Sequence, residues 1–335
     1  MILNRLALET MFIFVAICWI IPPLSLAKDG KWSQKADMPT ARFGLSTATV
    51  SGKIYAIGGR VGNTLLAKTE EYNSLTDKWT KKRDMPTRRE GFSTSSVANH
   101  IYAIGGGNLG RMLAVVEAYD STTNSWTRKA DMPTPRWGLS SSAVNGKIYA
   151  IGGDKDALTT VEVYDPMTNT WAQGMDMPTP RWGLSTAVVN GKIYVIGGTP
   201  NGIESLDTVE VYDPATDTWT PREGMPTPRW GFSADVVNGK IFAVGGTQNG
   251  RDGLGNVEVY DPLTDTWTRA PDMPTARGNL ATSAVDSKVY AIGGSQGLLR
   301  RALSTVEAYD TGLPPQSVQS RQKITTIWGQ LKVQR

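Results

Sequence analysis

The sequence contains a single cysteine, Cys18, and a single histidine, His100, among its 335 residues. Cys18 falls in an N-terminal segment that we expect to be removed, so the mature chain would hold no thiol for a disulfide, a nucleophile or a metal ligand. One isolated histidine cannot build a zinc site or a serine–histidine pair. These scarcities exclude common hydrolase and metal chemistries. We expect no cofactor, no metal ion and no enzymatic activity.

The first 27 residues differ from the rest of the chain. Arg5 precedes an unbroken apolar run over residues 11–21, and small residues follow at Ser25 and Ala27, the positions that a signal peptidase recognises. This layout predicts a signal peptide over residues 1–27 and a secreted, periplasmic or cell-surface protein. The run is short for a transmembrane helix, so we expect no stable membrane span after cleavage. An uncleaved membrane anchor is the alternative.

The net charge of +4 belongs to the C-terminal tail, residues 311–335. That tail has no acidic residue and carries Arg321, Lys323, Lys332 and Arg335. Charges therefore balance over residues 28–310, and we expect no nucleic-acid partner. The tail shows no repeat feature and contains prolines, which argue against a further strand. We expect a linker or docking segment with a short ordered piece near Trp328.

A glycine pair follows an aromatic and hydrophobic run six times, at intervals of 45 to 48 residues. One copy predicts four short strands, called A to D in chain order: residues 183–189, 192–198, 208–213 and the segment around Trp219. Asn-Gly pairs join A to B in three copies, and this dipeptide favours two-residue hairpins because both positions tolerate positive φ. Four antiparallel strands repeated six times bury their faces by stacking radially. The sequence therefore predicts an all-β, six-bladed propeller.

The hydrophobic run, the double glycine and the spaced tyrosine and tryptophan resemble the kelch repeat, over about residues 31–310. Propellers of this family often close their ring by joining the two chain ends. Trp32 precedes the first copy, and no tryptophan follows Tyr309 at the usual spacing. We therefore expect the segment around Trp32 to complete the sixth blade of one domain, residues 28–310, which is a monomer.

The alternation of strand direction places the D–A and B–C loops on one face of the ring, named here the long-loop face. Its B–C loops differ in length and sequence, as binding loops on a rigid scaffold do. An arginine opens every A strand, and an aromatic residue follows it in four copies, whereas Glu90 and Gly278 stand there in the others. The predicted ligand-binding residues are Arg42, Arg89, Arg136, Arg181, Arg229, Arg277, Phe43, Trp137, Trp182 and Trp230.

Six guanidinium groups would then ring the mouth of the central channel beside aromatic walls. Arginine pairs with carboxylates through two hydrogen bonds, and tryptophan stacks on sugars or anchors peptides. The family resemblance also implies that arginines at this position bind acidic peptides. We predict an exported binding module for an acidic peptide, a protein surface or a glycan. The structural alternative pairs each arginine with backbone carbonyls or a strand C glutamate, and packs each tryptophan beneath a loop.

Two enzyme classes are known among propellers of this kind. Copper radical oxidases need a cysteine-modified tyrosine and paired histidines, which this chain lacks. Sialic-acid mutarotases need no metal, so Arg89 and Glu90 keep a sugar-acid isomerase as one alternative. A passive scaffold module is another, because the repeats are so uniform. The fold does not choose among these functions.

Overall fold

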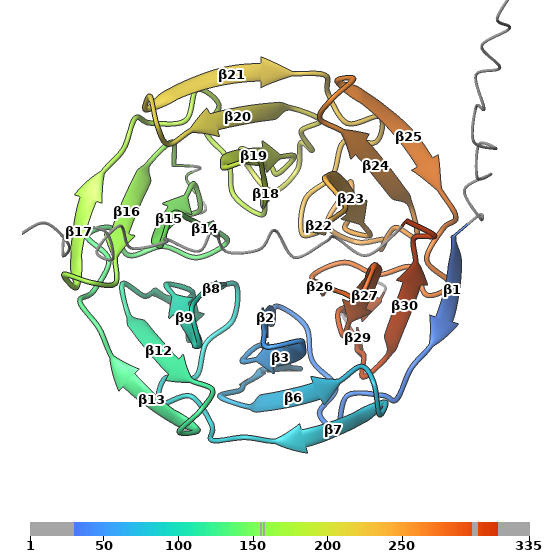
Figure 1. Cartoon of the computed structure of the whole chain (residues 1–335), viewed down its shortest axis with the longest axis horizontal. Coiled ribbons are helices and arrows are strands. Elements are labelled where there is room, and N and C mark those ends of the chain that lie inside the picture. Colours follow the sequence, from blue (N-terminus) through green and yellow to red (C-terminus); the bar gives the residue numbers. More distant parts are fainter. Residues whose placement is uncertain (1–29, 155, 157, 297–300, 314–335) are drawn as a thin grey trace, which may run out of the picture.

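The computed structural model describes residues 30–154, 156, 158–296 and 301–313, and it confirms a six-bladed β-propeller (Figure 1). Each blade is a four-stranded antiparallel sheet, and the blades stand around one centre. The predicted signal peptide and Trp328 lie outside the described residues. In the part that the structure describes there is no helix, and hence none that could cross a bilayer.

Strands A and B form the inner half of each blade (Figure 1). The A strands are β2 (Ser46–Val50), β8 (Ser93–Val97), β14 (Ser140–Val144), β18 (Ser185–Val189), β22 (Ser233–Val237) and β26 (Ala281–Val285). The B strands are β3 (Lys53–Ile57), β9 (His100–Ile104), β15 (Lys147–Ile151), β19 (Lys192–Ile196), β23 (Lys240–Val244) and β27 (Lys288–Ile292). The predicted Asn-Gly turns join them: Asn190 has φ 52° and Gly191 φ 74°.

Strands C and D form the outer half of each blade. The C strands are β6 (Thr69–Asn73), β12 (Val116–Asp120), β16 (Val161–Asp165), β20 (Val209–Asp213), β24 (Val257–Asp261) and β30 (Val306–Asp310). The D strands are β7 (Lys78–Lys81), β13 (Ser125–Arg128), β17 (Thr170–Gln173), β21 (Thr218–Arg222), β25 (Thr266–Ala270) and, for the last blade, β1 (Lys31–Gln34).

Among the residues that the structure describes, three B–C loops carry short hairpins that the sequence did not predict. They are β4 (Arg60–Val61) with β5 (Thr64–Leu65), β10 (Gly107–Asn108) with β11 (Arg111–Met112), and β28 (Ser295–Gln296) with β29 (Arg301–Ala302). Isolated β-bridges such as Trp182 to Thr199 and Trp230 to Thr247 join the end of a D–A link to the start of a B–C loop. The D–A and B–C loops therefore share the long-loop face.

The hydrophobic core lies between neighbouring blades. Strand B is buried on both faces, and Ile54, Ala56 and Ile57 have no exposed surface. In the core between the first and last blades, the rings of Tyr72 and Tyr290 meet edge to face with centroids 5.7 Å apart. Burial of this kind stabilises by about 25 cal/mol per Å² of apolar surface. Radial stacking is therefore what holds the ring together.

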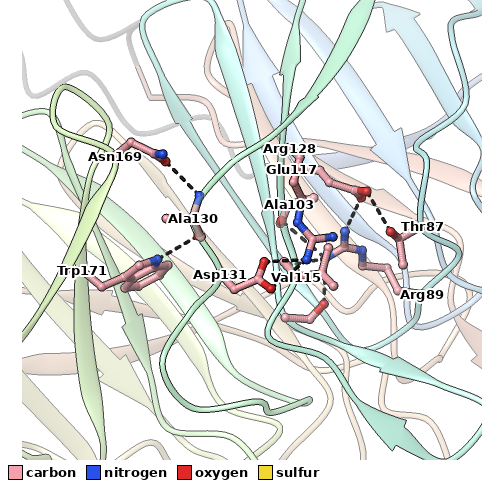
Figure 2. Close-up of polar contacts among 11 residues, drawn as sticks. Thr87, Arg89, Ala103, Val115, Glu117, Arg128, Ala130, Asp131, Asn169 and Trp171 are labelled. Atoms are coloured by element: carbon pink, nitrogen blue, oxygen red, sulfur yellow. Dashed lines mark hydrogen bonds and ion pairs between the residues drawn. The ribbon is translucent and has the colours of Figure 1, made fainter.

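The chain ends close the ring as predicted. β1 pairs with β30 in an antiparallel register that sets Trp32 opposite Tyr309, and the two rings lie 5.3 Å apart. The Trp32 indole N–H donates to the carbonyl of Pro271 at 2.9 Å, on the link from the preceding blade. The tryptophan of each of the other five D strands donates an equivalent hydrogen bond, for example Trp171 to the carbonyl of Ala130 at 3.0 Å (Figure 2). Closure therefore uses the same contact as the other blade junctions.

Candidate functional site

The six arginines that open the repeats are fully buried, with no exposed surface. Each forms an ion pair with the strand C glutamate of its own blade: Arg42–Glu70, Arg89–Glu117, Arg136–Glu162, Arg181–Glu210, Arg229–Glu258 and Arg277–Glu307. None of the six lines the central cavity. The prediction of a ring of guanidinium groups at the channel mouth is therefore wrong. The arginines instead follow the structural alternative, in which each one pairs with a strand C glutamate.

Figure 2 shows the reason in the second blade. Strands B and C pass here into their loop, where backbone carbonyls can accept hydrogen bonds from side chains as well as from the backbone. Arg89 donates to the carbonyls of Gly105 at 2.9 Å and Val115 at 2.8 Å, and it pairs with Glu117. The second carboxylate oxygen of Glu117 accepts the Thr87 hydroxyl at 2.7 Å. The arginine therefore bridges strands B and C at the point where they separate.

The same Thr-x-Arg segment and glutamate recur in all six blades, so this network belongs to the blade. Burial lowers the pKa of Arg42 to about 10, while the charge of Glu70 opposes the change. That arginine still carries its charge at neutral pH. A buried pair of this kind contributes little net stability compared with an apolar pair, but breaking it leaves a buried charge without compensation.

The four predicted aromatic residues do line the cavity. Trp182 lies between Trp137 and Trp230, with ring centroids 4.9 Å from each. Phe43, Trp182 and Trp230 are buried, and Trp137 keeps a partly exposed face. Gly202 and Gly250 of the B–C loops pack over the Trp182 and Trp230 rings. Packing under the loops and lining the channel are therefore both observed, and Trp137 is the most accessible aromatic of the rim.

The cavity occupies the centre of the ring and has a volume of about 560 Å³. This lies within the range of about 300–1,000 Å³ for small-ligand pockets. Its aromatic rim leads to hydroxyl groups of the A strands, which hydrogen-bond between blades. Such pairs include Ser46–Thr94 at 2.9 Å, Ser140–Thr186 at 2.8 Å and Ser233–Thr282 at 2.9 Å. Polar hydroxyl groups therefore line the wall below the aromatic rim.

Of the described residues that line this cavity, three are charged: Arg60, Glu90 and Asp235. Arg60 and Glu90 form a half-buried ion pair at 2.9 Å, and the Arg60 guanidinium also lies 5.1 Å from the centre of the Phe43 ring. Glu90 was singled out from the sequence beside Arg89. The structure separates those two, because Arg89 is buried in the blade whereas Glu90 faces the cavity with Arg60.

Sequence reasoning missed Asp235, which stands at the middle of β22. Burial raises the pKa of this carboxyl to about 6, although backbone N–H groups of Val236 and Ala284 act against the rise. The sequence did contain a signal for Asp235, because the other five copies of the repeat all have alanine or serine at this position. Within the described residues, no group of three metal-ligating side chains gathers, and His100 begins β9 beside an A–B turn.

A six-bladed β-propeller with a ligand-sized central channel is the class that this geometry defines. The family model for the KLHDC2/KLHL20/DRC7 Kelch-repeats domain matches residues 25–175 and 129–294. The chain therefore belongs to the kelch-repeat propeller family, whose fold is typical of protein-binding modules. A search of curated proteins found no match to this chain.

Proposed function

We propose that this propeller is a non-enzymatic binding module that receives a peptide or glycan segment of its partner at the mouth of the central channel. The observation that carries the proposal is the cavity of about 560 Å³ with its aromatic rim. Pockets with apolar walls and a few polar groups are the usual places for ligands. Tryptophan provides large contact area at a small cost in conformational entropy.

The buried arginines alter the expected ligand chemistry. All six guanidinium groups are committed to glutamates, and Arg60, the cation of the mouth, is paired with Glu90. They give no reason to prefer an acidic ligand. Export remains part of the proposal, on the layout of residues 1–27, which lie outside the described residues.

The test is a glycan array and a peptide library, each probed with the native protein and with Trp137→Ala. Trp137 is the least buried rim tryptophan, so its replacement should remove ligand contact with little effect on folding. Met167→Ala is the matched control, because Met167 is 94% exposed on a C–D turn of the opposite face. Specific binding that Trp137→Ala weakens at least tenfold and Met167→Ala preserves supports the proposal. Binding unaffected by Trp137→Ala contradicts it, and the absence of any ligand favours a passive scaffold.

The isomerase alternative depended on an arginine at the channel, and Arg89 does not line the cavity. Arg89 is buried, and the carboxylate of Glu90 is neutralised by Arg60. No observation in the described residues favours this chemistry over binding. An anomer-exchange assay of sialic acid with Glu90→Gln remains its direct measurement.

A further inference from the structure

Asp235 is the one place where an A strand carries a carboxylate in its middle position. The equivalent residues in the other five blades are Ala48, Ser95, Ser142, Ala187 and Ser283. Five blades therefore fold with a small side chain here, and the fold itself does not require an acid. A residue that the scaffold does not need, placed on the wall of a cavity, is a candidate for ligand contact.

The Asp235 side chain lies at the seam between β22 and β26. One carboxylate oxygen accepts the N–H of Val236 at 2.9 Å, and the group is half-buried where it lines the cavity. No ion pair to Asp235 is found among the described residues, whereas Glu90, the other acid on the wall, has Arg60 as its partner. The channel wall therefore holds one carboxylate without a counter-charge.

We propose that Asp235 is the counter-charge for a ligand's ammonium group that enters the central channel. The ligand class is a primary amine on a narrow chain, whether a free alkylamine or the amino terminus of a peptide. This inference deepens the proposed function and rests on it, since it names the chemistry that the channel accepts. The ammonium group donates hydrogen bonds to the Asp235 carboxylate, which charge assistance strengthens.

The shape of the channel favours a slender ligand. Asp235 follows Trp230 by five residues, so it lies at most about 16 Å further along the strand at about 3.3 Å per residue. An alkyl chain or a chain terminus is slender enough to extend along a channel of this length. The rim tryptophans offer aromatic faces near the entry, and such faces attract cations.

Binding should depend on pH through Asp235. Burial raises the pKa of its carboxyl to about 6, so at pH 5 only about a tenth of the empty sites carry the charge that an ammonium ion needs. The wall residues that β26 and β18 place nearby are uncharged, and the remaining charged residues of the cavity are Arg60 and Glu90, which form a pair. We expect affinity about tenfold weaker at pH 5 than at pH 7.5.

Isothermal titration calorimetry of the full chain tests the inference with n-butylamine, its neutral analogue n-butanol, pentaglycine amide with a free amino terminus (free pentaglycine), and its neutral analogue N-acetyl-pentaglycine amide. We expect saturable binding of butylamine or free pentaglycine at pH 7.5, and none of their neutral counterparts. Asp235→Asn keeps a hydrogen-bond acceptor and removes the charge, so it should weaken binding at least tenfold and abolish the pH effect. Asp235→Ser introduces the residue that three of the other blades carry here and should weaken binding in the same way.

The outcomes separate this inference from the proposed function. Tighter binding of free pentaglycine than of butylamine assigns a peptide terminus, and the reverse order assigns a small amine. Equal affinity for amines and their neutral analogues, or unchanged affinity in Asp235→Asn, overturns the inference. If peptides or glycans still require Trp137 in that case, the proposed function stands. No binding by any probe, together with no dependence on Trp137 in the ligand screens, overturns both.

Discussion

Replacing Asp235 with asparagine should make the propeller more stable at neutral pH. In the unfolded chain this carboxyl ionises near its ordinary pKa of 3.8, whereas in the folded chain burial raises the pKa to about 6. The folded state therefore binds the proton more tightly. The stability that Asp235 contributes is fully present below about pH 4 and is lost as the pH rises through about 6.

The size of this effect follows from the two pKa values. Their difference corresponds to about 3 kcal/mol of unfolding free energy. This figure is an upper bound because the side chain is half-buried and its channel side faces solvent. Asparagine keeps an acceptor for the Val236 N–H and carries no charge, so Asp235→Asn should gain up to about 3 kcal/mol at pH 7.5. At pH 4, native Asp235 is protonated, and the two proteins should be equally stable within about 0.5 kcal/mol.

Urea unfolding of both proteins, followed by tryptophan fluorescence at pH 4 and pH 7.5, measures this difference. Other acids titrate alike in both proteins, so the change in the gap with pH isolates Asp235. A gap that stays constant between the two pH values would refute the reasoning, because its source would then not be ionisation. A variant less stable than the native protein at pH 7.5 would show that the ionised carboxylate stabilises the fold.

Three further changes test the blade architecture by urea unfolding. Arg136→Ala leaves Glu162 buried without its partner and should cost about 3–5 kcal/mol; a loss under about 1 kcal/mol would contradict the buried-pair assignment. Trp32→Phe removes the indole N–H bond to Pro271 and should cost about 1 kcal/mol, whereas unchanged stability would show that this hydrogen bond does not stabilise the closure of the ring. Gly183→Ala imposes a side chain at φ 62° and should cost about 1–2 kcal/mol, and a stabilised variant would refute the need for positive φ.

The fold could be predicted because its determinants are local and repeated. Asn190-Gly191 specifies a tight turn by its own backbone preferences, and the six glycine pairs set the period. Counting tryptophans placed Trp32 beside Tyr309, which the register confirms. The short hairpins in the B–C loops were missed, because β4 and β5 are two residues each and carry no alternating pattern.

The site was harder because sequence position does not fix the direction of a side chain. Arg89 and Glu90 are neighbours, yet one turns under strands B and C while the other faces the cavity. Arg89 donates to one carbonyl at the end of strand B and to one at the start of strand C, so its binding place forms only when the blade is folded. Arg60 lies in a B–C loop, and its contact with Glu90 depends on the Phe43 to Arg60 bridge between two segments.

The six copies of the repeat nevertheless separate structure from function within one chain. A residue present in every blade meets the same environment six times, and the buried arginines show that such a residue serves the blade. A residue present once has five sister positions that demonstrate what the fold would accept instead. Asp235 stands where serine or alanine suffices and ionises at a cost in stability, so selection for a stable blade does not explain it. Departures from the repeat that reach the channel are therefore where the ligand chemistry of this propeller should be sought.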